Sequence, residues 1–196
     1  MARPRSIDTN DILDAAEATV IEKGPAKLTL EAVAMCAGIS KASVIYDYKS
    51  KNELIRAVIV RRLACEEQRI VDAMNPEDGS RQSLLDALIK VAAVRPAEER
   101  CIANNLSAAL AQDDELTNLI NGYYHRLIAQ VEEVKEHPRG ALLAFLALEG
   151  LKMLEMRGFH EWSPEERECI LADIAWLAES DPAPACPQSG SATDPS

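Results

Sequence analysis

The chain has 196 residues, of which 47% are hydrophobic, so it can fold around a substantial core of its own. No run of about 18 apolar residues occurs and the first residues lack an apolar signal segment, so we expect no membrane span, no export signal and a cytoplasmic protein. The net charge of −11 does not exclude binding to nucleic acid, because the acidic residues are unevenly distributed. Residues 1–62 carry ten Lys and Arg against eight Asp and Glu, whereas the remainder carries eleven against twenty-four.

Three helices are predicted in the first 50 residues. The first begins at the N-cap Asp8 and ends at Gly24-Pro25, with apolar residues at helical spacing from Ile12 to Val20. A short helix follows from Thr29 to about Ala37, and another runs from Ser40 to about residue 46. Two short helices joined by a glycine turn at Gly38 predict a helix-turn-helix.

Helix signals continue to the end of the chain and strand patterns are absent, so the predicted fold class is all-α, with about nine helices. Ser50 and Glu53 form a capping box that opens a helix to about Met74, and further helices are predicted at about 81–94, 97–111 and 114–136. A helix from Pro138 to Gly158 contains "ALLAFLAL", which is apolar on every side and should be covered on two sides. A second capping box at 163–166 opens the last helix, and residues 181–196 have the composition of a disordered tail.

The segment around the third helix concentrates groups that suit a DNA backbone. Ser40 caps a helix whose N-terminus favours anions, and Lys41 lies in its first turn. Ser43 and Tyr46 share related faces, from which a hydroxyl and a phenol can meet base edges or phosphates. Lys49 and Lys51 flank the cap of the next helix. The alternative is a plain turn between helices with solvated lysines.

Residues 8–55 closely resemble the N-terminal DNA-binding domain of the TetR family, the tetracycline-repressor-like regulators. The resemblance is carried by Ile12-Leu13, Ala15-Ala16, Glu22-Lys23-Gly24, Thr29, Val33-Ala34, Ala37-Gly38-Ile39-Ser40-Lys41, Tyr46, Tyr48, Ser50-Lys51 and Glu53-Leu54. It implies a three-helix DNA-binding domain at residues 1–55 and a helical ligand-sensing and dimerisation domain at residues 56–180. The DNA-binding residues that we predict are Thr29, Ser40, Lys41, Ala42, Ser43, Ile45, Tyr46, Lys49 and Lys51.

Four residues depart from the family pattern. Ala42 stands where glycine is frequent, Ile45 where tyrosine is usual, Asp47 where histidine is common, and Tyr48 where phenylalanine packs. A carboxylate at Asp47 is repelled by phosphates unless it accepts a hydrogen bond from a cytosine amino group or points away. We therefore expect DNA binding with an altered sequence preference.

The resemblance also implies a homodimer in which the helices at 138–157 and 164–179 form a four-helix bundle with the same pair from a second subunit. The small residues Ala141, Ala144, Ala147 and Gly150 would permit close approach. The predicted interface residues are Leu142, Phe145, Leu146, Glu149, Met153, Ile170, Ile174 and Leu177. The alternative is an ordinary monomer core.

The function implied is a transcriptional repressor that binds a palindromic operator as a homodimer and is released by a small-molecule inducer. Candidate pocket residues are polar groups set among apolar ones, together with one aromatic wall: Asn104, Asn105, Tyr123, Tyr124, His125 and Phe145. Few aromatics and many acidic residues suggest an apolar or cationic inducer. No cofactor or metal is expected.

Three other functions compete with this interpretation. An enzyme is disfavoured, because the chain lacks a Gly-rich phosphate loop, HExxH and GxSxG, and its three histidines lack metal-ligand spacing. The five cysteines lie far apart with no CxxC pair and are expected to be free thiols, although Cys36 and Cys101 keep a redox sensor open. A helical protein-interaction module with weak DNA binding is the remaining alternative.

Overall fold

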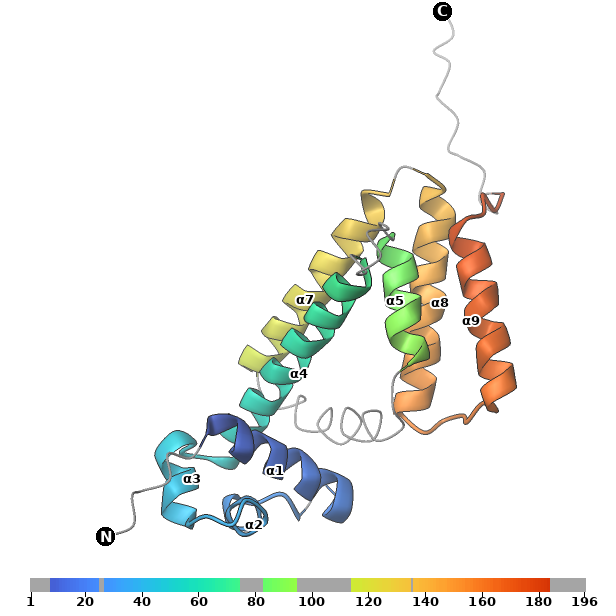
Figure 1. Ribbon diagram of the computed structural model, residues 1–196. Helices are drawn as coiled ribbons and strands as arrows, with labels where there is room; N and C mark the ends of the chain where they lie inside the picture. Colours follow the sequence, from blue (N-terminus) through green and yellow to red (C-terminus); the bar gives the residue numbers. More distant parts are fainter. Residues whose placement is uncertain (1–7, 25–26, 75–82, 95–113, 135, 184–196) are drawn as a thin grey trace, which may run out of the picture.

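The computed structural model describes residues 8–24, 27–74, 83–94, 114–134 and 136–183. Within these ranges the chain forms eight helices and no strand, which confirms the all-α fold class. The helices are α1 (Thr9–Lys23), α2 (Leu30–Cys36), α3 (Lys41–Asp47), α4 (Lys51–Met74), α5 (Leu84–Ala93), α7 (Asp114–Glu132), α8 (Pro138–Met156) and α9 (Pro164–Ala178). Figure 1 shows α1–α3 as a small N-terminal unit and α5, α7, α8 and α9 as a bundle, with α4 running from one to the other. The helix predicted at 97–111 lies outside the described residues.

Local capping chemistry sets the predicted helix starts. The side chains of Asp8, Thr29 and Ser40 each accept a hydrogen bond from a backbone N–H of the helix that follows, as N-cap residues do. The capping box predicted for the last helix is present, with Ser163 and Glu166 satisfying each other's backbone N–H. The predicted starts of α1, α2, α3 and α9 are therefore confirmed.

The capping of α5 was not recognised in the sequence. Its N-cap is Ser83, which forms a capping box with Asp86, so the helix begins at Leu84 rather than at about residue 81. Asp86 occupies the N3 position, where Glu or Gln is usual in a capping box, so the sequence did not predict this cap.

The N-terminal unit has its own hydrophobic core. Its buried residues are Ile12, Leu13, Ala15, Ala16, Val20, Leu28, Val33, Ala34, Val44, Tyr48, Leu54, Ile55, Val58 and Ile59, joined by Leu116 of α7. The first part of α4 is thus a structural member of this unit. The N-terminal core extends past the boundary predicted after residue 55, because Val58 and Ile59 are buried in it.

A second core fills the bundle. It comprises Ile70 of α4, six residues of α5, three of α7, five of α8, and Leu171 and Ile174 of α9. Leu63 packs against both cores. Because α4 contributes to the two cores from its two ends without a break, it is the continuous mechanical link between them.

A second connection between the unit and the bundle runs along α7. Arg56 of α4 pairs with Glu115 of α7, and eleven residues further along both helices Glu67 pairs with Arg126, with 2.6 Å between the charged atoms. The constant offset between partners means that the two helices run parallel, side by side (Figure 1). Leu116 follows Glu115 and is only 1% exposed in the N-terminal core, so α7 also reaches from the bundle into the unit.

One side of α8 is covered by the described part of the chain, and the other side is exposed. Ala144, Phe145, Leu148 and Leu151 pack in the bundle core. On the opposite side, Leu143, Leu146, Met153 and Leu154 are exposed, with Leu146 at 55%. The helix was predicted to be covered on two sides, and the described part of the chain covers one of them.

Candidate functional site

The turn between α2 and α3 fixes how α3 is presented. Gly38 has a φ of +66°, a left-handed conformation that glycine adopts at low cost. The following N–H, that of Ile39, donates to the carbonyl of Ala34 at 2.9 Å and so closes the end of α2. Ser40 then caps α3: its Oγ lies 3.1 Å from the backbone nitrogen of Ser43 and 2.8 Å from the Ser43 hydroxyl.

Most of α3 faces solvent. Val44 is its single buried residue, whereas Ala42, Ile45 and Tyr46 are exposed, the last at 79%. A short helix that anchors itself through one valine and presents the rest of its surface is suited to entering a groove of another macromolecule. The predicted contact residues on α3 are thus accessible, and Asp47 is exposed at its end.

The lysines predicted to contact DNA are exposed, and the contacts of Lys41 and Lys49 within the chain are defined. The Nζ of Lys41 lies 3.4 Å from a carboxylate oxygen of Glu31, an exposed pair that water and salt screen. The Nζ of Lys49 donates to the carbonyl oxygens of Ile45 and Tyr46. Lys51 is exposed as the first residue of α4.

The predicted capping box at the start of α4 forms with one difference. Ser50 accepts from the N–H of Glu53 at 3.1 Å, as expected. The Glu53 carboxylate reaches back to the N–H of Lys49, at 2.8 Å, one residue before the cap. The turn between α3 and α4 is therefore fixed by two hydrogen bonds, one to the Ser50 hydroxyl and one to the Glu53 carboxylate.

Tyr48 lies inside the N-terminal core, which agrees with the aromatic packing role expected of it. Burial of the ring is the main cause that raises the pKa of Tyr48, and the neighbouring Asp47 carboxylate raises it further, while Arg61 opposes them. The phenol is therefore held in its neutral form well into the alkaline range.

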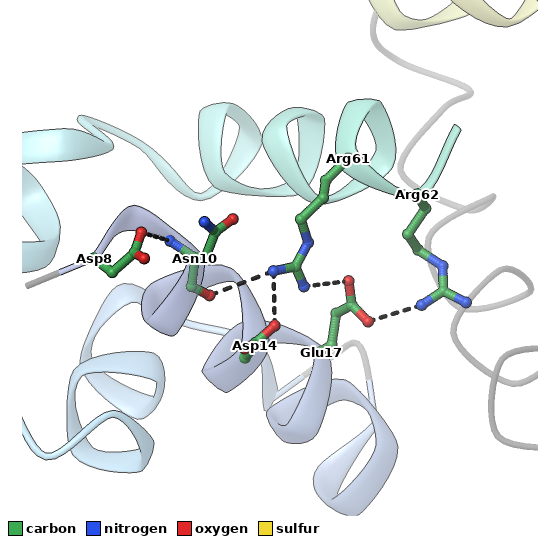
Figure 2. Close-up of polar contacts among 6 residues, drawn as sticks. All are labelled: Asp8, Asn10, Asp14, Glu17, Arg61 and Arg62. Carbon is green, nitrogen blue, oxygen red and sulfur yellow. Dashed lines mark hydrogen bonds and ion pairs between the residues drawn. The ribbon is translucent and has the colours of Figure 1, made fainter. Parts of the chain in front are cut away.

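A charged cluster fastens α1 to α4 (Figure 2). The guanidinium of Arg61 donates to Asp14 at 2.7 Å, to Glu17 at 2.6 Å and to the carbonyl of Asn10 at 3.3 Å. The second oxygen of Glu17 accepts from Arg62 at 2.8 Å. Arg61 and Glu17 are each only about one-fifth exposed, so this pairing is better shielded than a surface ion pair.

The cluster also sets the ionisation of Arg61. Burial alone lowers its pKa, but the hydrogen bonds to Glu17 and Asp14 outweigh that effect, so the pKa of Arg61 is raised above its ordinary value. This cluster was not predicted from the sequence. Its signal is the i, i+3 spacing of Asp14 and Glu17, which places two carboxylates on one face of α1.

The candidate pocket residues separate into three groups. Tyr123 and Phe145 are buried in the bundle core, at 5% and 2% exposure, and their rings contribute to packing. Tyr124 is half-buried, and its hydroxyl donates to the Glu149 carboxylate at 3.0 Å. His125 is exposed, which argues against a place in an enclosed pocket, and Asn104 and Asn105 lie outside the described residues.

The Glu149 carboxylate also binds Lys152. Its other oxygen lies 2.6 Å from the Lys152 Nζ, and both side chains are less than one-fifth exposed. The resulting cluster of Tyr124, Glu149 and Lys152 joins α7 to α8. It was not predicted from the sequence, because Tyr124 and Glu149 are 25 residues apart.

Two predicted interface residues belong to the core of the single chain. Phe145 and Ile174 are nearly inaccessible within the single chain, so they offer little surface to a partner. Ala141 and Ala144 likewise face the chain's own core, because they pack in the bundle. The outward side of α8 instead carries exposed residues that include Leu146 and Met153, while Leu142, Ile170 and Leu177 are partly buried.

Three further properties of the described residues concern metal binding, membrane insertion and thiol chemistry. They contain no group of three or more His, Cys, Asp or Glu side chains placed to bind a metal ion. Every described helix is too short or too polar to span a bilayer. Cys36, Cys65 and Cys169 are exposed free thiols, whereas Cys101, the stronger candidate for a reactive thiol, lies outside the described residues.

Solved structures with a similar fold include transcriptional regulators. The crystal structure of a transcriptional regulator from Rhodococcus sp. Rha1 matches with a TM-score of 0.69 and 17% identity over 89% of this chain and 98% of that one. A TetR transcription regulator from Haloarcula marismortui matches with a TM-score of 0.66 and 20% identity over 87% and 95%. A transcriptional regulator from Saccharomonospora viridis in complex with choline matches with a TM-score of 0.68 and 16% identity over 85% and 94%. At these identities the likeness establishes the fold.

Family models account for both parts of the chain. No curated protein matches it. The model of the bacterial regulatory proteins of the tetR family matches residues 12–58, and the model of a tetracycline-repressor-like C-terminal domain matches residues 82–179. With an N-terminal DNA-binding domain and a C-terminal regulatory domain that both match, the chain belongs to the TetR family of transcriptional regulators.

Proposed function

We propose that this regulator is a repressor that binds a palindromic operator as a homodimer and leaves it when a small-molecule inducer binds the bundle. The observation that carries the proposal is the presentation of α3, which buries only Val44 and leaves Tyr46 and its neighbours accessible. A helix of this kind enters the major groove of B-DNA, where base edges can be distinguished. Such a regulator works where the chromosome is, so we infer a cytoplasmic protein.

The exposed side of α8 supports the homodimer. Leu143, Leu146 and Leu154 recur at helical spacing beside the small residues Ala147 and Gly150, which are also exposed. Trp176 of α9 adds a further exposed apolar side chain. We infer that this surface pairs with its copy across a two-fold axis, because an isologous interface buries the same apolar patch of both subunits. Two α3 helices would then meet half-sites about 34 Å apart.

Inducer control requires a path from the bundle to α3. α4 contributes to both hydrophobic cores, and Leu116 anchors α7 in the N-terminal one. A ligand that prefers one arrangement of α7 and α8 shifts the population toward the orientation of the N-terminal unit that goes with it. We propose that this orientation spaces the two α3 helices wrongly for the operator.

The chemistry of the bundle favours certain classes of inducer. The Glu149 carboxylate is already paired with Lys152 and Tyr124, and the core of the bundle is apolar. One protein of similar fold holds choline, a quaternary ammonium ion. We infer an apolar or cationic inducer, and a neutral aromatic or acidic compound that releases the protein from its operator would contradict this.

The DNA-binding proposal is tested by selecting bound sequences from a random duplex library at two salt concentrations. We expect a palindrome to be enriched and its binding to weaken as salt rises, because neutralised phosphates release counterions. Tyr46→Ala should bind the selected operator more weakly, whereas Phe159→Ala, which removes an equally exposed aromatic ring far from α3 in the sequence, should not. A folded dimer that enriches no sequence would overturn the proposal and direct the search to protein partners.

The homodimer is tested separately by equilibrium sedimentation at micromolar concentration. We expect the wild type to be a dimer and Leu146→Glu to be a monomer, because the substitution places a charge at the centre of the apolar surface. The matched control is Leu119→Glu, which alters an exposed leucine of α7 and should leave the dimer intact. A monomeric wild type would refute the assembly.

A further inference from the structure

The side chain of Lys49 turns back onto the helix that precedes it. Its Nζ donates to the carbonyl oxygen of Tyr46 at 2.6 Å and to that of Ile45 at 3.1 Å. These carbonyls belong to the last turn of α3, where backbone acceptors lack partners within the helix and the helix dipole favours a cation. Lys49 therefore caps the C-terminus of the exposed helix.

The same ammonium group lies over an aromatic ring. The Lys49 Nζ is 5.4 Å from the centroid of the Tyr46 ring, within the range of a cation–π contact. Tyr46 is 79% exposed, so few packing contacts fix its rotamer. The contact with Lys49 holds the ring at one side of the α3 end.

The backbone of Lys49 is itself fixed from the other side of the turn. Its N–H donates to the Glu53 carboxylate at 2.8 Å, and Glu53 is held at the start of α4 by the Ser50 cap. Lys49 thus has its main chain tied to α4 and its ammonium group tied to α3. Two of the three N–H groups of the Lys49 ammonium donate to protein carbonyls.

We infer that Lys49 is a positioning residue that orients Tyr46 for DNA recognition, and that it does not act as a phosphate contact of its own. The inference rests on the proposed DNA-binding function and reassigns a lysine that the sequence predicted to bind the DNA backbone. Its consequence is that loss of Lys49 weakens operator binding through Tyr46 and leaves the number of neutralised phosphates unchanged.

The salt dependence of operator binding distinguishes the two roles. Lys49→Met keeps most of the length of the side chain and removes the ammonium group, and we expect operator affinity to fall about two- to fivefold, as for loss of an exposed cation–π contact. The slope of log K against log salt should stay that of the wild type. A direct phosphate contact would instead reduce the slope by about 0.9, and that result would overturn the inference.

A double-mutant cycle checks that the effect passes through the ring. In the Tyr46→Leu background, Lys49→Met should cost less than about twofold, because no ring remains to be oriented. Lys49→Arg, which can still donate to the carbonyls and stack on the ring, should retain operator affinity close to that of the wild type. Equal losses from Lys49→Met with and without Tyr46 would contradict the inference.

Spectroscopy of the free protein separates failure of this inference from failure of the proposed function. In nuclear magnetic resonance spectra without DNA, the side-chain methylene signals of Lys49 should shift when Tyr46 is replaced by Leu, because the ring current is removed. A matched replacement, Phe159→Leu, should leave them in place. If the signals do not respond to Tyr46→Leu, the contact is absent and the inference fails, whether or not an operator is found.

Discussion

Gly140 lies where α8 meets the end of α9, and replacing it by alanine should destabilise the protein. A Cβ atom at this position would stand 2.1 Å from the carbonyl oxygen of Ser180 and 2.4 Å from that of Leu177. Both are backbone atoms at the C-terminus of α9 and cannot rotate away, so the two helices must separate locally. Close contacts of this kind cost about 1–3 kcal/mol in well-packed proteins.

Part of that cost is offset by the helix itself. Alanine is favoured over glycine in a helix by up to about 1 kcal/mol, so Gly140→Ala should lower the free energy of unfolding by about 1–2 kcal/mol. The control is Gly122→Ala in α7, where the nearest heavy atom to a new Cβ is the end of the Arg126 side chain at 3.8 Å. Gly122→Ala gains the helix propensity of alanine without a steric clash, so its free energy of unfolding should equal or slightly exceed that of the wild type.

Urea unfolding followed by circular dichroism measures both variants, and thermal melts should place Gly140→Ala several degrees below Gly122→Ala, at about 2–4 °C per kcal/mol for a chain of this size. Equal stability of the two variants would refute the close packing of α8 on α9. Under the proposed assembly Gly140→Ala should also weaken the dimer, since α8 and α9 form its surface together.

Three further substitutions test polar groups of the fold. Glu17→Gln removes the carboxylate shared by Arg61 and Arg62, so we expect a loss of stability of about 1–2 kcal/mol in urea unfolding. We also expect a change in the inducer concentration needed to release the operator. Because the folded-state pKa of Tyr48 is raised, its contribution to stability is complete below pH 10.0 and is lost as the pH rises through the folded value; Tyr48→Phe should therefore flatten the fall of stability measured above pH 10. Arg167→Met leaves the Glu155 carboxylate, 7% exposed, without its partner and should cost about 3 kcal/mol in urea unfolding, whereas the double replacement with Glu155→Leu should cost less.

The parts of the fold that were predicted from sequence depend on neighbouring residues. A cap such as Ser163 and its partner Glu166 are three residues apart, so the chemistry that starts the helix is visible in the sequence itself. The same holds for the left-handed turn at Gly38 and for the Ser40 cap of the short helix beyond it. Locally encoded features gave the helix-turn-helix with nearly correct boundaries.

The parts that were missed depend on residues that only the fold brings together. Glu17 and Arg61 are 44 residues apart, and nothing in either segment identifies the other as its partner. The apolar helix α8 shows the same limit, because its composition predicts burial without saying which side is buried by the chain. The sequence therefore does not distinguish Phe145 from Leu146 as part of a partner surface, although only Leu146 is exposed.

The contacts between the N-terminal unit and the bundle are of a strength that suits a switch. Leu116 and the continuous helix α4 give the unit a defined place, but the two ion pairs that hold α7 along α4 include exposed carboxylates of Glu115 and Glu67. Exposed pairs contribute at most about 1 kcal/mol each, so they bias the orientation of the unit without fixing it. The pairs lie eleven residues apart, about 16 Å along parallel helices, and a tilt of α7 therefore changes both. Under the proposed mechanism, an inducer with a modest preference for one tilt is then sufficient to redistribute the orientations of α3, because a population shift requires only a differential affinity comparable to the bias.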